Sequence, residues 1–248
     1  MPLFGDDDSQ EAFKTNGSGF QFSGVQISKL GASEYTLFGI ACDTSSSVGP
    51  FAAEIEGCLK SAIESCQRSP RVDNLLARFL TFNSQISEQH GFRPLADCPL
   101  GSYSGSIRCG GQTVLRDACV NLVDSLATYG KQLIDNDYIA NGIVVVITDG
   151  CDVGSTLGLT QVAEALKRAQ VSESLESLVS ILVGVNVQDS TVSQHLQELK
   201  DKAGFTQYVE ASDATPKTLA KLAAFISKSV SSQSQSVGSG GPSQTINF

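Results

Sequence analysis

The stretch 143–150 reads IVVVITDG, and its first five residues form an unbroken run of β-branched side chains. Such a run is typical of a strand in the middle of a parallel sheet, where helices cover both faces. On either side of this stretch, short apolar runs alternate with segments that have helical spacing. The alternation predicts one α/β domain with a parallel-dominated sheet.

The other predicted elements follow from the same two patterns. Apolar runs predict further strands at 35–42, 75–82, 86–92, 178–185 and 205–209, with the one at 86–92 short. Helical spacing predicts helices at 50–66, 113–126, 159–169, 192–203 and 216–226.

The two ends of the chain differ from this body in composition. Residues 1–19 are polar, with three consecutive aspartates, and predict a flexible acidic arm. Residues 20–228 form the single domain, of which 20–34 is a strand or arm extension. Residues 229–248 are rich in Ser and Gly and predict a flexible tail. Its apolar tip, Ile246 and Phe248, is a candidate contact with a partner or with another copy.

Composition and charge exclude several classes of protein. Hydrophobic residues make up 41% and charged residues 17%, as in a globular protein, and the net charge of -9 disfavours nucleic acid and anionic membranes. We find no secretory signal and no apolar stretch long enough to span a membrane. Seven cysteines without a Cys-x-x-Cys pair predict a reducing, cytoplasmic location. Cys98 and Cys109 share one loop and are expected to be free, with a disulfide or metal role as the alternative.

Three polar pieces carry the candidate chemistry. Asp43-Thr-Ser45-Ser-Ser47 follows the strand at 35–42, Thr113 follows two glycines at the start of a helix, and Asp149 follows the IVVVI strand. Residues just past the ends of parallel strands gather at one edge of a sheet, where ligands bind. Two carboxylates and three hydroxyls suit a hard cation, and we expect Mg²⁺, with Mn²⁺ or Ca²⁺ as alternatives.

In this order, the three pieces resemble the metal-ion-dependent adhesion site of von Willebrand factor A domains, of a bacterial or phage cytoplasmic type. The family pattern is Asp-x-Ser-x-Ser, then a Thr after a Gly-rich loop, then an Asp at the end of the fourth strand. The resemblance covers roughly residues 35–228. It implies a three-layer, doubly wound (Rossmann-like) fold with six strands, mostly parallel, and one short antiparallel strand at an edge.

The resemblance also implies a function. The three hydroxyls would coordinate Mg²⁺, the two carboxylates would hold its waters or bind it directly, and an acidic side chain of a partner protein would complete the octahedron. We therefore expect an adaptor that binds a protein, or another copy of itself, and is not an enzyme. Gln112, between the glycines and the threonine, departs from the commonest form without removing a ligand.

Two alternatives remain at this stage. The chain could be a structural protein that assembles through its C-terminal tail. It could instead be a Mg²⁺-dependent phosphatase of haloacid dehalogenase type, whose nucleophilic Asp also follows a strand. That chemistry needs a second Asp two residues after the first, and Ser45 stands there. No Walker A or dinucleotide-binding pattern occurs.

The remaining candidates have simpler interpretations. His90 and His195 are expected to lie on the surface or in packing, Asp117 to cap a helix or face solvent, and Asp152 to be solvated or to shape the metal loop. Residues 93–112 form a long Gly/Ser/Pro loop, a type that is often functional. Its candidate partner contacts are Arg93, Tyr103 and Arg108.

Overall fold

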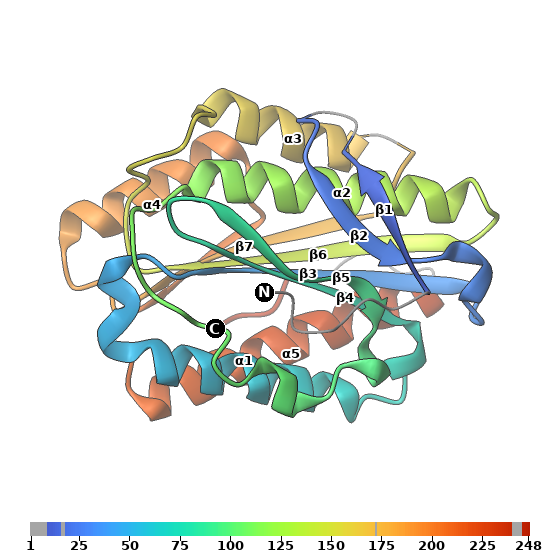
Figure 1. Cartoon of the computed structure of the whole chain (residues 1–248), viewed down its shortest axis with the longest axis horizontal. Coiled ribbons are helices and arrows are strands. Elements are labelled where there is room, and N and C mark those ends of the chain that lie inside the picture. Colours follow the sequence, from blue (N-terminus) through green and yellow to red (C-terminus); the bar gives the residue numbers. More distant parts are fainter. Residues whose placement is uncertain (1–8, 16–17, 172, 240–244) are drawn as a thin grey trace.

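The computed structural model describes residues 9–15, 18–171, 173–239 and 245–248, in which strands and helices alternate as predicted (Figure 1). The strands are β1 (Gln10–Lys14), β2 (Gln21–Val25), β3 (Glu34–Asp43), β4 (Leu75–Phe82), β5 (Ile86–Pro94), β6 (Ile139–Thr148), β7 (Leu178–Val185) and β8 (Gln207–Ala211). The α-helices are α1 (Ala52–Gln67), α2 (Leu115–Ile134), α3 (Leu159–Val171), α4 (Ser190–Ala203) and α5 (Pro216–Ser239). None of the described helices is long and apolar enough to cross a membrane.

The sheet has the strand order β1-β2-β5-β4-β3-β6-β7-β8. The six predicted strands occupy the positions from β5 to β8, and β5 is antiparallel to β4 as expected. β3 pairs in parallel with both β4 and β6, so the winding of the chain reverses between β3 and β6. In an open α/β sheet, this reversal opens a crevice at the carboxyl ends of the two strands.

Two apolar clusters hold the layers together. One packs α2, α3 and α4 on one face of the sheet, and the other packs α1 and α5 on the opposite face (Figure 1). The β-branched run of β6 contributes side chains alternately to both clusters, with Val144 and Val146 in one and Ile143, Val145 and Ile147 in the other. The central strand is therefore covered on both sides, as its sequence predicts.

The N-terminal residues differ from the predicted flexible arm at 1–19. Within that range, Gln10–Lys14 is a strand that pairs antiparallel with β2, and β2 in turn lies beside β5. The sheet therefore has eight strands rather than six, and β5 is not at its edge. Phe13 explains the difference, because its ring stacks on Phe22 and meets Tyr129 of α2 edge-on. Asp6 to Asp8 lie outside the described residues.

The structure also differs from the prediction of a flexible tail at 229–248, because α5 continues to Ser239. The serine- and glutamine-rich sequence stays helical where its polar groups bond to the sheet. Asn141 Nδ2 donates to the Gln233 carbonyl oxygen (2.7 Å), and Gln233 Nε2 donates to Ser177 Oγ (2.9 Å). Composition alone misses these bonds, since they depend on a partner strand far away in the sequence.

The loop at 93–112 is packed, which corrects two of the predicted partner contacts. Arg93 is buried and Tyr103 is completely buried. The Tyr103 hydroxyl and His90 Nε2 are hydrogen-bonded at 2.8 Å, which fixes the loop on β5. Arg108 is exposed and stays a candidate contact. All seven cysteines are free, as expected, with Cys98 buried.

Candidate metal centre

The crevice between β3 and β6 brings together residues from distant parts of the sequence. Asp43 is the last residue of β3, and Asp149 directly follows β6. The two strands are in register up to Cys42 and Ile147, so their carboxyl ends lie side by side. The predicted meeting of the two aspartates at one edge of the sheet is found in the structure.

Hydrogen bonds join four of the five predicted ligands into one set. Asp43 Oδ1 accepts a bond from the Ser45 backbone N–H (2.7 Å), and Asp43 Oδ2 accepts one from Thr148 Oγ1 (2.6 Å). Ser45 Oγ and Ser47 Oγ lie 3.1 Å apart, and Ser47 Oγ donates to Asp149 Oδ1 (2.9 Å). Ser45, through its backbone N–H and its hydroxyl, and Ser47, through its hydroxyl, therefore link the two carboxylates. Sequence reasoning missed Thr148, which orients Asp43.

Thr113, the fifth predicted ligand, lies buried on a loop that is attached to the same set. The Gly110 N–H donates to the Thr44 carbonyl oxygen (2.9 Å), and the Ser46 N–H donates to the Gly111 carbonyl oxygen (3.2 Å). Gly111 has φ +79°, a conformation that glycine adopts without strain. A Cβ at Gly111 would also meet Ser84 Oγ at 2.5 Å, so glycine at this position lets the loop lie directly against Ser84, which follows β4.

The two carboxylates are in an environment that disfavours their charge. Burial raises the pKa of the Asp43 carboxyl to about 6; the bonds from Thr148 and Ser45 oppose this rise, and the charge of Asp149 adds to it. Burial also raises the pKa of Asp149, against the bond from Ser47. In the described part of the chain, no Lys or Arg forms an ion pair with either carboxylate.

The donor set fits a hard cation. Among the described residues, no three His, Cys, Asp or Glu side chains group so that they could hold a metal ion. A cation at this edge would therefore rest on two carboxylates and on hydroxyls. All of these donors are oxygen atoms, which Mg²⁺, Mn²⁺ and Ca²⁺ prefer. The negative charge of the pair, which no described Lys or Arg compensates, would supply the attraction.

Two further aspartates hold the loop that follows β6. Asp152 accepts bonds from the Arg116 N–H (3.1 Å) and from the Ser155 hydroxyl. Asp117 accepts bonds from the Thr156 N–H (3.0 Å) and the Leu157 N–H (2.8 Å). Asp152 therefore shapes the loop that follows β6, and Asp117 neither caps its own helix nor faces solvent. The sequence gives no signal for these bonds, because both acids act on backbone groups of another segment.

The rim of the crevice carries two thiols. Cys109 is exposed and Cys151 is half-buried. Burial raises the pKa of both thiols; nearby Asp43 and Asp149 raise that of Cys109 further, and Asp189 and Asp152 that of Cys151. The thiolate forms are therefore disfavoured, and neither thiol is an activated nucleophile.

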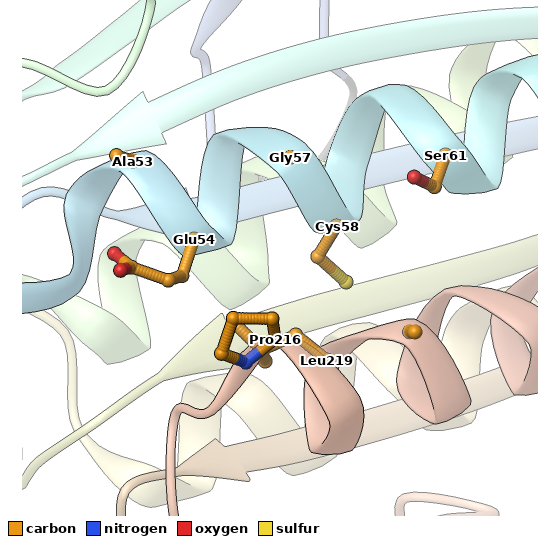
Figure 2. A pocket seen from close by; sticks show the side chains of 8 residues that line it. Ala53, Glu54, Gly57, Cys58, Ser61, Pro216 and Leu219 are labelled. Carbon is orange, nitrogen blue, oxygen red and sulfur yellow. The ribbon is translucent and has the colours of Figure 1, made fainter.

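A separate hollow of about 330 Å³ lies between α1 and the start of α5. Figure 2 shows Cys58 of α1 pointing toward Pro216 and Leu219 of α5, while the Glu54 carboxylate extends to the side. The lining provides one carboxylate, one hydroxyl and one thiol, with no aromatic ring and no basic group. It lacks the converging polar groups of a small-molecule site, and we assign it no ligand.

Comparison with known proteins bears on the fold. The sequence matches no protein-family model and no curated protein. Among solved structures, it resembles the D319A mutant of the PilB minor pilin from Streptococcus sanguinis, with a TM-score of 0.62 at 14% identity, covering 90% of this chain and 67% of that one. It also resembles the pilus adhesin SpaC from Lactobacillus rhamnosus GG, with a TM-score of 0.58 at 12% identity, covering 92% and 35%.

A third similar structure is proximal thread matrix protein 1 from the mussel byssus, described with a zinc-occupied MIDAS (metal-ion-dependent adhesion site) motif. Its TM-score is 0.53 at 17% identity, and the match covers 82% of this chain and 47% of that one. The chain has the fold of a von Willebrand factor A domain. The predicted fold class is thereby confirmed, while the chain spans about a third to two thirds of these three proteins.

Proposed function

We propose that the crevice between β3 and β6 binds a divalent cation, and through it an acidic side chain of a partner protein. One observation carries the proposal: Asp43 and Asp149 are linked through Ser45 and Ser47, in a setting that raises both carboxyl pKa values, without a basic partner in the described chain. A bound cation would offset that charge. The zinc-occupied motif named for the mussel protein, which is similar in fold, supports the binding of a divalent metal.

The residues that would hold the cation are the hydroxyls of Ser45, Ser47 and Thr113 and the carboxylates of Asp43 and Asp149. Mg²⁺ is our preferred ion, with Mn²⁺ or Ca²⁺ as alternatives. Neutral hydroxyls offset little of the positive charge of a bound cation. The cation would therefore attract one more carboxylate strongly. Ser47 is exposed, which leaves an approach to the site from solvent.

Binding without turnover is the activity that we propose for this site. His90, one of the two histidines, is bonded to Tyr103 in the core, and burial lowers its pKa to about 3, so it is not available as a general base for this site. Ser45 stands where a phosphatase would need its acid–base Asp. The neighbours in fold are named as a pilin, an adhesin and a matrix protein, and these names favour a role in protein interaction.

The cytoplasmic location stays a prediction that rests on seven cysteines without a Cys-x-x-Cys pair. A direct check is cell fractionation of the native host, followed by detection of this chain in each fraction. Recovery from the surface or secreted fraction would contradict the prediction and would leave the cation proposal unaffected.

The proposed recognition can be tested with displayed peptides of random sequence. Peptides are selected on the wild-type protein in Mg²⁺ and counter-selected in EDTA. We expect the enriched peptides to share an Asp or Glu, and binding to disappear when that residue becomes Asn or Gln. Binding should also disappear with Asp149→Ala, while Asp73→Asn, an exposed acid on another loop, should bind as the wild type does.

Two results would contradict the proposal. One is selection of peptides that bind equally well in EDTA, and the other is equal binding by Asp149→Ala. Circular dichroism of each variant shows whether a loss of binding reflects a loss of fold.

A further inference from the structure

The C-terminal residues 245–248 lie against the body of their own chain. The carbonyl oxygen of Ile246 accepts a bond from Gln207 Nε2, at the start of β8 (2.9 Å). The half-buried Ile246 side chain packs against the apolar cluster beneath α1 and α5. The Phe248 ring meets the Phe225 ring edge-on, with 5.6 Å between centroids. The segment is thus held by one polar and two apolar contacts.

The position of Phe225 shows how the segment is arranged. Phe225 lies fourteen residues before Ser239, where α5 ends, which is about 21 Å along a helix that rises 1.5 Å per residue. Phe248 nevertheless contacts Phe225. Residues 245–248 therefore lie alongside the helix that precedes them, rather than beyond its end.

We propose that the surface beside α5 and β8 is a peptide-binding site for the Ile-Asn-Phe sequence at 246–248. The same segment of a second copy can bind there in place of the chain's own segment. The contacts are few, and Phe248 remains 49% exposed, so the segment is held reversibly. A second copy presents the same three residues and can make the same contacts. Reciprocal exchange between two copies gives a closed dimer.

The site shares no residue with the crevice between β3 and β6. Its recognition is apolar, through Ile246 and Phe248, with one hydrogen bond from Gln207 that sets the position of the peptide backbone. The expected binding is therefore independent of divalent cations. Failure of the cation proposal would leave this one standing, and the reverse also holds.

The test uses the full chain with Ile246→Ser and Phe248→Ser together, which empties the site. The probe is a fluorescein-labelled peptide of residues 243–248, SQTINF, and the control peptide is SQTSNS. We expect saturable binding of SQTINF to the double variant, in EDTA as in Mg²⁺. Binding to the wild type should be at least about ten-fold weaker, because its tethered segment competes at an effective concentration of about 1 mM.

Gln207→Ala in the double variant should weaken peptide binding several-fold while the circular dichroism stays native. Sedimentation equilibrium supplies the second measurement: wild-type protein should form dimers as its concentration approaches about 1 mM, and the double variant should not. The proposal is overturned if the folded double variant fails to bind SQTINF or binds SQTSNS equally well. It is equally overturned if the wild type remains monomeric.

Discussion

Two sets of charged side chains in and beside the sheet differ in whether the described part of the chain supplies a counter-charge. Arg78 of β4 is almost completely buried, and its Nε donates to Glu88 Oε2 of β5 (2.8 Å). The other carboxylate oxygen of Glu88 accepts bonds from the Ser23 N–H (2.9 Å) and hydroxyl (2.7 Å), which attaches β2. Asp43 and Asp149, by contrast, have hydroxyl partners and no basic one in the described chain.

The difference separates a structural charge from a functional one. A paired buried charge holds three strands together, and removal of one partner leaves the other charge without compensation. An acid pair without a counter-charge costs stability, and such groups concentrate at binding and catalytic sites. Each of the following changes tests one side of this comparison.

The largest loss of stability is expected from Glu88→Gln. The change leaves the Arg78 guanidinium buried beside a neutral amide, and we expect the free energy of unfolding to fall by about 2–4 kcal/mol. Urea denaturation followed by circular dichroism measures it. The control is Glu198→Gln, which removes one acid of an exposed pair with Lys202 and should leave the unfolding midpoint unchanged. Equal midpoints for the two variants would remove the structural half of the comparison.

Asp43→Asn is expected to have the opposite effect and to stabilise the metal-free protein. The amide removes a charge that burial disfavours, so the free energy of unfolding at about pH 7.5 should rise by about 1–3 kcal/mol. The same variant should no longer be stabilised by Mg²⁺. Denaturation with and without EDTA measures both effects, and a destabilised metal-free variant would show that Asp43 is structural.

The dependence on pH follows from the raised pKa of Asp43. Its value of about 6 lies above that of a free Asp, about 3.9, so the folded chain binds a proton between these values that the unfolded chain does not. The contribution of Asp43 to the free energy of unfolding therefore increases as the pH falls through about 6.

Mg²⁺ competes with that proton for the same carboxylate. The rise in melting temperature on adding Mg²⁺ should be clear at about pH 7.5 and nearly lost at about pH 5. Thermal denaturation at both pH values is the measurement. An unchanged Mg²⁺ effect at the lower pH would place the cation elsewhere.

The smallest effect is expected from Asp117→Asn, which weakens the bonds to Thr156 and Leu157 and loosens the loop after β6. We expect a loss of about 1 kcal/mol in the free energy of unfolding. Mg²⁺ affinity should fall only a few-fold, because the cation ligands themselves are unchanged. Complete loss of Mg²⁺ binding would mean that this loop contributes a ligand.

The sequence predicted the elements that depend on local pattern. The β-branched run of β6 and the Asp-x-Ser-x-Ser stretch identified the central strand and the crevice, because buried parallel strands and hard-cation ligands both have short, readable patterns. The arm at 1–19 and the tail at 229–248 were misjudged. Phe13 packs against α2, and Gln233 is hydrogen-bonded to β6. Both of these elements are far away in the sequence from the residue that they hold.

The candidate ligands were also easier to predict than their surroundings. The order of Asp43, Thr113 and Asp149 along the chain could be read directly. The contacts of Thr148 with Asp43, and of Asp117 with another loop, depend on how the loops meet in three dimensions. Arg93 and Tyr103 were expected at a binding surface because they lie in a long loop, yet that loop is packed against β5.

The most direct test of the central claim is a calorimetric titration of the protein with MgCl₂ alone. Wild-type protein, Asp149→Ala and the control Asp73→Asn are compared after removal of metal with EDTA and dialysis. We predict single-site binding to the wild type and to Asp73→Asn, with none to Asp149→Ala. Equal binding by all three proteins, or none by the wild type, would contradict the claim that these two aspartates form a cation site.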